Sequence, residues 1–156
     1  MQTIKRNYSA IAAAVSSQGD QQQRMQQVVD ALWDALHDTG VSWVGFYLDR
    51  PDEQDDQRLV LGPRRDKPAC SPIGLHGVCG KALLTRSVQI VRDVNELGPN
   101  YIACDPRDRA EIVLPLFDSN GCCWGVLDVD SWNVGAFDET DAAGLHQVLC
   151  AAGLTI

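Results

Sequence analysis

Helical patterns stand at both ends of the chain. In residues 21–37 apolar side chains recur every three to four positions, which predicts an amphipathic helix that Gly40 ends. A shorter helix is expected at residues 8–15, ahead of a polar break at 16–19. A third helix is expected to begin at Asp138, because the run Asp138-Glu-Thr-Asp141 resembles a capping box.

Between these helices the chain carries strand patterns. Strands are expected at 41–48, 58–62, 88–91, 111–117 and 122–130, the last two joined by a hairpin turn at 118–121. A short helix is expected at 77–86. Residues 63–76 and 95–109 show no periodicity, and loops this long inside a compact domain are usually lids or binding loops.

This order of elements predicts one α+β domain over residues 1–156, long enough to bury a core without metals or disulfides. The terminal helices should pack on one face of a central, largely antiparallel sheet. The two irregular stretches, with their short helices, should roof a pocket on the other face.

Three carboxylates are expected on the roofed face. Alternation places Asp128 and Asp130 on one side of their strand, and Glu111 can join them if the hairpin pairs the two strands. The alternative is that all three face solvent at strand ends. In a covered pocket they would repel one another and require a cation or a shared proton. A substrate ammonium group would supply the cation, and a raised carboxyl pKa would make one acid a proton donor.

Charge and composition narrow the function classes. The net charge of −8 argues against nucleic acid or an anionic membrane surface as a partner. The sequence begins without the apolar core of a signal peptide and contains no apolar run of 18 residues. A reducing, cytoplasmic location is therefore expected, where the six cysteines are more plausibly thiols than permanent disulfides.

The cysteines divide into two groups. Cys70 and Cys104 lie in the irregular stretches, and Cys79 begins the short helix, where the helix N-terminal field is expected to stabilise a thiolate. Their spacings of nine and 25 residues match no zinc-binding cysteine pair, so no metal site is predicted and a redox thiol set is favoured. The others are expected to be small buried hydrophobic residues: Cys122, Cys123 and Cys150.

Seven short runs, in this order, resemble the free methionine-(R)-sulfoxide reductases, which are stand-alone GAF-domain enzymes. The resemblance covers about residues 25–150. The runs are SWVGFYL (42–48), LVLGP (59–63), KPAC (67–70), GVCG (77–80), YIACD (101–105), EIVLPL (111–116) and GVLDVDS (125–131).

The resemblance implies a GAF-like fold and a role for each candidate residue. Cys104 matches the nucleophile, Cys70 the main resolving cysteine and Cys79 the third cysteine of the family. The matching pocket acids are Glu111, Asp128 and Asp130, with Asp128 assigned to the substrate ammonium and the other two to the sulfoxide. Trp43 and Tyr47 match the aromatic wall around the substrate methyl group, although ordinary core packing explains the same pattern.

The implied reaction reduces free L-methionine-(R)-sulfoxide through a sulfenic acid and an intramolecular disulfide. An external dithiol, such as thioredoxin, would restore the thiols, with no bound cofactor. A homodimer is also expected. The segment 71–77 and the spacing before Cys104 depart from the family pattern, which bears on the Cys70–Cys104 geometry. The alternatives are a non-catalytic GAF module that binds a small ligand and a redox sensor without turnover.

Overall fold

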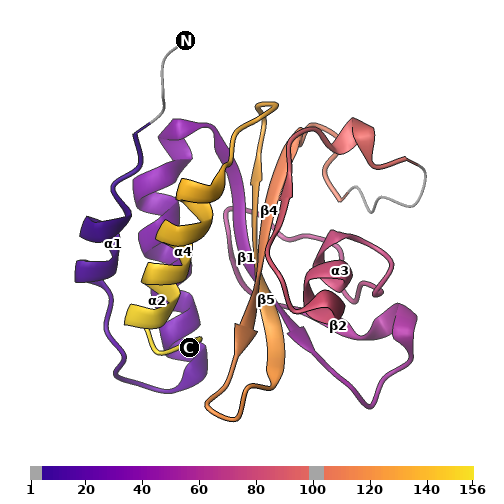
Figure 1. Ribbon diagram of the computed structural model, residues 1–156, viewed down its shortest axis with the longest axis horizontal. Helices are drawn as coiled ribbons and strands as arrows, with labels where there is room; N and C mark the ends of the chain where they lie inside the picture. The colour runs from indigo at the N-terminus through magenta and orange to yellow at the C-terminus, as the bar shows by residue number, and fades with distance from the viewer. Residues whose placement is uncertain (1–4, 99–103) are drawn as a thin grey trace.

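A five-stranded antiparallel sheet divides the part of the chain that the computed structural model describes, residues 5–98 and 104–156 (Figure 1). The strand order is β2-β1-β5-β4-β3, and every neighbouring pair is antiparallel. The strands are β1 (Val41–Asp49), β2 (Leu59–Arg65), β3 (Gln89–Val91), β4 (Ala110–Phe117) and β5 (Cys123–Ser131).

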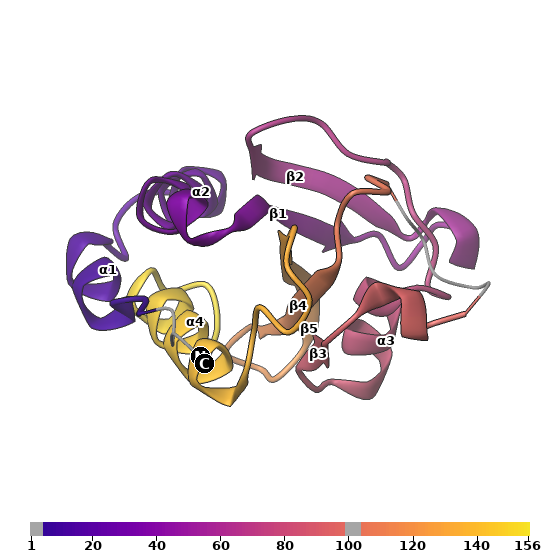
Figure 2. The ribbon, with the colours of Figure 1, turned by 90° about the horizontal axis from the view of Figure 1, so that it is seen from above.

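Helices cover the two faces of the sheet differently (Figure 2). On one face lie α2 (Gln21–Leu36) and α4 (Glu139–Ala151), and α1 (Tyr8–Ala14) packs on both of them. On the other face lies α3 (Val78–Thr85), together with the loop that precedes it. Single turns of 3₁₀-helix stand at His37–Thr39 (η1), Asp55–Gln57 (η2) and Val94–Glu96 (η3).

Local sequence explains where the long helices begin and end. Asp20 and Asp138 both form capping boxes, with Gln23 and Asp141 as their reciprocal partners. After α2 the chain turns through η1 into Gly40, whose φ of 98° favours glycine. The reciprocal contacts of Asp138 with Asp141 confirm the capping box predicted there.

The main core lies between the sheet and the three helices. Alternate residues of β4 and β5 point into it, among them Ile112, Leu114, Leu116, Leu127 and Val129, all at most 1% exposed. The opposite residues of the same strands point toward α3. The predicted α+β fold, with its terminal helices on one face, is confirmed.

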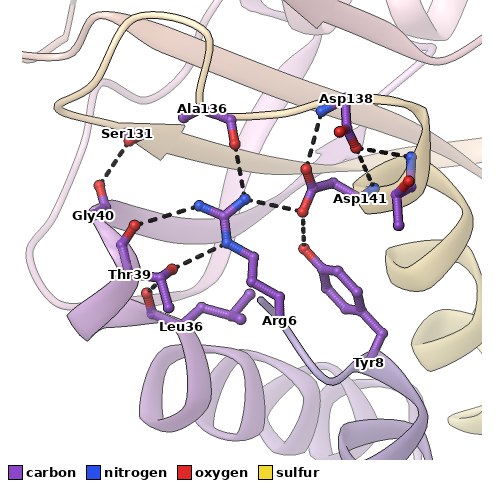
Figure 3. A network of polar contacts seen from close by, with 10 residues as sticks. Arg6, Tyr8, Leu36, Thr39, Gly40, Ser131, Ala136, Asp138 and Asp141 are labelled. Carbon is purple, nitrogen blue, oxygen red and sulfur yellow. Dashed lines mark hydrogen bonds and ion pairs between the residues drawn. The ribbon is translucent and has the colours of Figure 1, made fainter. Parts of the chain in front are cut away.

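A buried ion pair joins the N-terminal segment to the far end of the chain (Figure 3). Arg6 Nη1 donates to Asp141 Oδ1 at 2.9 Å, and the Tyr8 hydroxyl donates to the same oxygen at 2.6 Å. Arg6 also donates to the Ala136 carbonyl at 2.8 Å and to Thr39 Oγ1 at 3.0 Å. Only 3% of the Arg6 side chain is exposed, so this network joins α1 and the residues before it to the start of α4 and to η1.

Among the predicted strand boundaries, the end of β2 differs most from the structure. Strand β2 continues to Arg65 instead of ending at Gly62, because Arg64 and Arg65 still pair with Gly45 and Val44 of β1. The first irregular stretch therefore begins at residue 66. Part of the second irregular stretch, residues 99–103, lies outside the described residues. Among the helices that the structure describes, none is long and apolar enough to cross a membrane.

Candidate active site

Three carboxylates form the floor of a cavity of about 210 Å³ on the α3 side of the sheet. Glu111 on β4 pairs with Asp130 on β5, and Val113 pairs with Asp128, so the hairpin register brings the three acids together. Glu111 and Asp128 are each only 6% exposed, and Asp130 is half-buried. The alternative of acids facing solvent at strand ends is wrong.

Burial makes these carboxyls hard to ionise. It raises the pKa of Glu111, and burial together with the neighbouring acids raises the pKa values of Asp128 and Asp130 well above their usual range. Glu111 Oε1 and Asp128 Oδ1 find no hydrogen-bond partner among the described residues. The floor therefore suits a bound cation, and at neutral pH it can hold a proton ready for donation.

Two aromatic residues of β1 form one wall of the cavity. Trp43 and Tyr47 are 3% and 2% exposed, and their ring centroids lie 6.1 Å apart. Between them Gly45 leaves room for the indole, because a Cβ atom there would lie 2.1 Å from Trp43 Cη2. The missing side chain of Gly45 thus sets the position of the Trp43 ring.

The same aromatic residues hold the loop that carries Cys70. Trp43 Nε1 donates to the Lys67 carbonyl at 2.8 Å, and the Tyr47 hydroxyl donates to the Cys70 carbonyl at 2.8 Å. Further along, Ile73 forms a β-bridge with Leu59 at the start of β2. Residues 67–73 are therefore fastened to the sheet at several points.

Cys70 and Cys104 form a disulfide at the exposed edge of the cavity. Their Cα atoms lie 5.6 Å apart, within the usual range of about 4.4–6.8 Å. Both residues are exposed, and Cys104 lines the cavity. This is the pair that the family resemblance implied, so the altered 71–77 segment leaves the two cysteines within bonding reach.

A charged cluster ties the two cysteine-bearing loops together beside the disulfide. Asp105 accepts from Lys67 Nζ at 2.5 Å and from Arg107 Nη2 at 2.9 Å. The Lys67 ammonium and the Arg107 guanidinium both lie over the Trp132 ring, 5.1 and 4.6 Å from its centroid. Hydrogen bonds from Arg107 and then Lys67 hold the pKa of Asp105 well below its usual range. The two loops are thus joined by the Lys67–Asp105 ion pair as well as by the disulfide.

A fourth acid, Asp108, lies in the cavity wall and was not predicted from the sequence. It is 6% exposed, and its Oδ1 accepts from the Ser42 hydroxyl at 2.6 Å. Burial raises its pKa, while the Ser42 hydrogen bond opposes the rise. Because Ser42 is 66 positions away, nothing in the local sequence indicates that Asp108 is buried.

Cys79 also lines the cavity, but unlike Cys104 it is buried. It is 5% exposed, and burial together with Asp128 and Glu111 raises the pKa of its thiol well above the usual value. The expectation of a thiolate stabilised by the helix N-terminus is therefore wrong, because desolvation and negative neighbours oppose that field. The Cys79 sulfur and one carboxylate oxygen each from Glu111 and Asp128 lie within 4.8 Å of one another.

The remaining cysteines are not the buried group that was predicted. Cys122, at the end of the hairpin turn, and Cys150, on the outer side of α4, are exposed, and Cys123 is half-buried. Cys150 Sγ lies 3.5 Å from His146 Nε2, one helical turn earlier. None of these three thiols lines the cavity described above.

Comparison with known proteins agrees with the family that the sequence motifs resemble. A family model described as "GAF domain" matches residues 19–156. The free methionine-R-sulfoxide reductase of Saccharomyces cerevisiae is 38% identical over 120 residues, covering 75% of this chain and 65% of that protein. Its Escherichia coli counterpart is 43% identical over 113 residues, covering 71% and 64%. The matches thus span slightly less than two thirds of these relatives.

A solved structure extends the match over more of the chain. It is the free methionine-R-sulfoxide reductase of Neisseria meningitidis in complex with its substrate. The TM-score is 0.80 at 36% identity, covering 94% of this chain and 83% of that one.

Proposed function

This chain belongs to the GAF-domain proteins and, among them, to the free methionine-R-sulfoxide reductases, so we propose that it reduces free L-methionine-(R)-sulfoxide to methionine. One observation carries the proposal. A pair of cysteines close enough to form a disulfide stands at the edge of a cavity whose floor holds two buried carboxylates, Glu111 and Asp128, each with one oxygen that finds no hydrogen-bond partner among the described residues.

In the proposed complex the free amino acid is recognised by its charge. Asp128 binds the ammonium group, which supplies the positive charge that the floor lacks. Glu111 and Asp130 face the sulfoxide oxygen, and Trp43 and Tyr47 enclose the methyl group. A methionine sulfoxide inside a peptide has no free ammonium, so this arrangement would favour the free amino acid.

The proposed reaction balances with two thiols from the protein. The Cys104 thiolate attacks the sulfoxide sulfur while a protonated carboxyl donates to the oxygen. Methionine leaves, and the oxygen stays on Cys104 as a sulfenic acid. The Cys70 thiol attacks that sulfur, forms the Cys70–Cys104 disulfide and releases water. Cys79 is buried, whereas Cys70 is exposed and lies within bonding reach of Cys104, which supports Cys70 as the resolving thiol.

Regeneration is proposed to use an external dithiol of the thioredoxin type. Both disulfide-bonded residues are exposed, which supports access by a protein reductant. Because each turnover ends in a disulfide, the protein needs a reducing compartment such as the cytoplasm. The expected homodimer stays a prediction, and light scattering on the purified protein tests it.

The test is methionine formation from free L-methionine-(R)-sulfoxide with a dithiol reductant. Cys104→Ser is expected to lower kcat by at least about a thousandfold, because it removes the nucleophile. Cys70→Ser is expected to release one methionine per chain and then to accumulate a sulfenic acid at Cys104, detectable by dimedone labelling and mass spectrometry. Cys150→Ser, a change of the same type at an exposed thiol outside the cavity, is the control.

Two results would overturn the proposal. If the wild-type protein forms no methionine with its thiols reduced, it is a binding module or a redox sensor instead. If Cys104→Ser retains full turnover, the nucleophile lies elsewhere.

A further inference from the structure

The Cys79 sulfur and one carboxylate oxygen each from Glu111 and Asp128 form a group of potential ligands inside the fold. The three atoms lie within 4.8 Å of one another, and the three residues are between 5% and 6% exposed. Glu111 Oε1 and Asp128 Oδ1 are unpartnered among the described residues, and Cys79 is outside the disulfide. We propose that Cys79, Glu111 and Asp128 bind a thiophilic divalent cation of the Zn²⁺ type.

The donor set selects the class of ion. Zn²⁺ binds cysteine sulfur and carboxylate oxygen, and a site with three protein ligands leaves its fourth position open. Zn–S and Zn–O bonds of about 2.3 and 2.1 Å place tetrahedral ligands about 3.5 Å apart, so the group closes by little more than about 1 Å around the ion. Mg²⁺ and Ca²⁺ prefer oxygen ligands alone and would gain little from a sulfur atom.

The charge balance around the cavity favours a cation at this position. Its floor carries several acids, whereas the cations that line it, Lys67 and Arg107, are already paired with Asp105. A bound ion would neutralise two carboxylates and stabilise the Cys79 thiolate, with release of the thiol proton. Cysteine spacing in a sequence identifies metal sites built on cysteine pairs, so it does not reveal a site that takes one cysteine from α3 and two acids from the sheet.

The ion would occupy the place that the proposed function gives to the substrate ammonium. Asp128 cannot serve both, so the metal and free methionine sulfoxide would compete. This inhibitory consequence rests on the proposed function, whereas the binding of the metal does not.

The binding experiment uses the full-length oxidised protein, in which the Cys70–Cys104 disulfide removes two thiols. Cys122→Ser and Cys150→Ser are introduced together to remove the exposed thiols, including the one beside His146. Co²⁺ is the probe, because a cysteine ligand gives a sulfur-to-cobalt charge-transfer band. We expect one Co²⁺ per chain with that band, displacement of Co²⁺ by Zn²⁺, and no displacement by Mg²⁺ at the same concentration.

Variants then identify the ligands. Adding Cys79→Ser is expected to abolish the charge-transfer band, and Cys123→Ser, at a half-buried thiol outside the cavity, is expected to retain it. Glu111→Gln is expected to weaken binding by more than the 10–100-fold that losing an outer-shell partner costs. It also keeps the test decisive if Cys79→Ser does not fold. The proposed site would be overturned if the protein with Cys122→Ser and Cys150→Ser gave no charge-transfer band, or if the band persisted after Cys79→Ser was added.

A separate measurement tests competition. The variant Cys104→Ser is expected to bind substrate without turning it over, and Cys70→Ser, Cys122→Ser and Cys150→Ser are added to it so that no exposed thiol binds Co²⁺. In this variant free methionine-(R)-sulfoxide should displace Co²⁺ from the site and remove the Cys79 band. Displacement supports the inhibitory role. Binding of Co²⁺ without displacement overturns that role while the site itself stands. Failure of the wild-type protein to form methionine would instead count against the proposed function and leave the metal titration unaffected.

Discussion

Replacing Asp128 with asparagine tests whether the cavity floor is destabilised by carboxylates that lack partners. Asp128 is 6% exposed, and its Oδ1 has no hydrogen-bond partner among the described residues. Asparagine keeps the shape of the side chain and cannot ionise. Its amide can also donate toward Glu111, which belongs to the same cluster and whose Oε1 has no hydrogen-bond partner among the described residues.

The expected gain in stability follows from the cost of an unsatisfied buried group, about 1–3 kcal/mol. For a chain of this length about 1 kcal/mol corresponds to about 2–4 °C, so Tm should rise by about 2–12 °C at neutral pH. Activity should change in the opposite direction. Under the proposed function Asp128 binds the substrate ammonium, and losing a buried charged contact of that kind costs about 2–5 kcal/mol, which lowers kcat/KM about thirtyfold or more.

The pH dependence provides a second, independent readout. Because the folded pKa of Asp128 is raised, the native state binds more protons than the unfolded state between the unfolded pKa, about 3.9, and the folded value. Its contribution to stability is therefore present at low pH and is lost as pH rises through the folded pKa. In Asp128→Asn the fall of stability with rising pH should become shallower.

The assay is thermal unfolding of the oxidised proteins from pH 4 to pH 8.5, monitored by calorimetry. Asp52→Asn makes the same chemical change at an exposed carboxylate and should leave both Tm and its pH slope unchanged. A lower Tm for Asp128→Asn at pH 8, or a slope equal to that of the wild type, would refute the reasoning.

Two further predictions concern the aromatic wall of the cavity and the buried Arg6–Asp141 ion pair. Gly45→Ala places a methyl group 2.1 Å from Cη2 of the Trp43 indole and should push the ring into the cavity. In the methionine assay KM should therefore rise about tenfold or more while kcat stays unchanged. Arg6→Met leaves the buried Asp141 carboxylate without its cation and should lower the unfolding free energy by about 3–5 kcal/mol in urea titrations without altering KM. A KM unaffected by the alanine, or a stability unaffected by the methionine, would contradict these accounts.

Strand alternation made the floor of the site predictable. Its period of two sets the side of the sheet on which Glu111, Asp128 and Asp130 lie, and the hairpin turn at 118–121 sets which residues pair. The apolar residues between them, such as Ile112 and Val129, enter the helix-side core by the same rule. Both predictions needed only information that is local in the sequence.

Features that depend on distant partners were not predictable in this way. The sequence does not show that Asp108 meets Ser42, or that Arg6 meets Asp141 135 positions later. The position of Cys79 at the start of a helix is local, but its pKa depends on the acids that the sheet places beside it. Burial was the wrong prediction for Cys150, although the helical spacing of α4 does place it opposite the buried face.

The Cys70–Cys104 disulfide also changes the stability of the whole fold. It joins residues 34 positions apart, and in the chain-entropy account a crosslink of this length disfavours the unfolded state by about 3–4 kcal/mol. The oxidised and reduced forms of the protein therefore differ in global stability as well as in chemistry. The reduced form, which the proposed function makes the substrate-binding one, is more open to proteolysis and thermal unfolding, and oxidation returns the chain to its more resistant state.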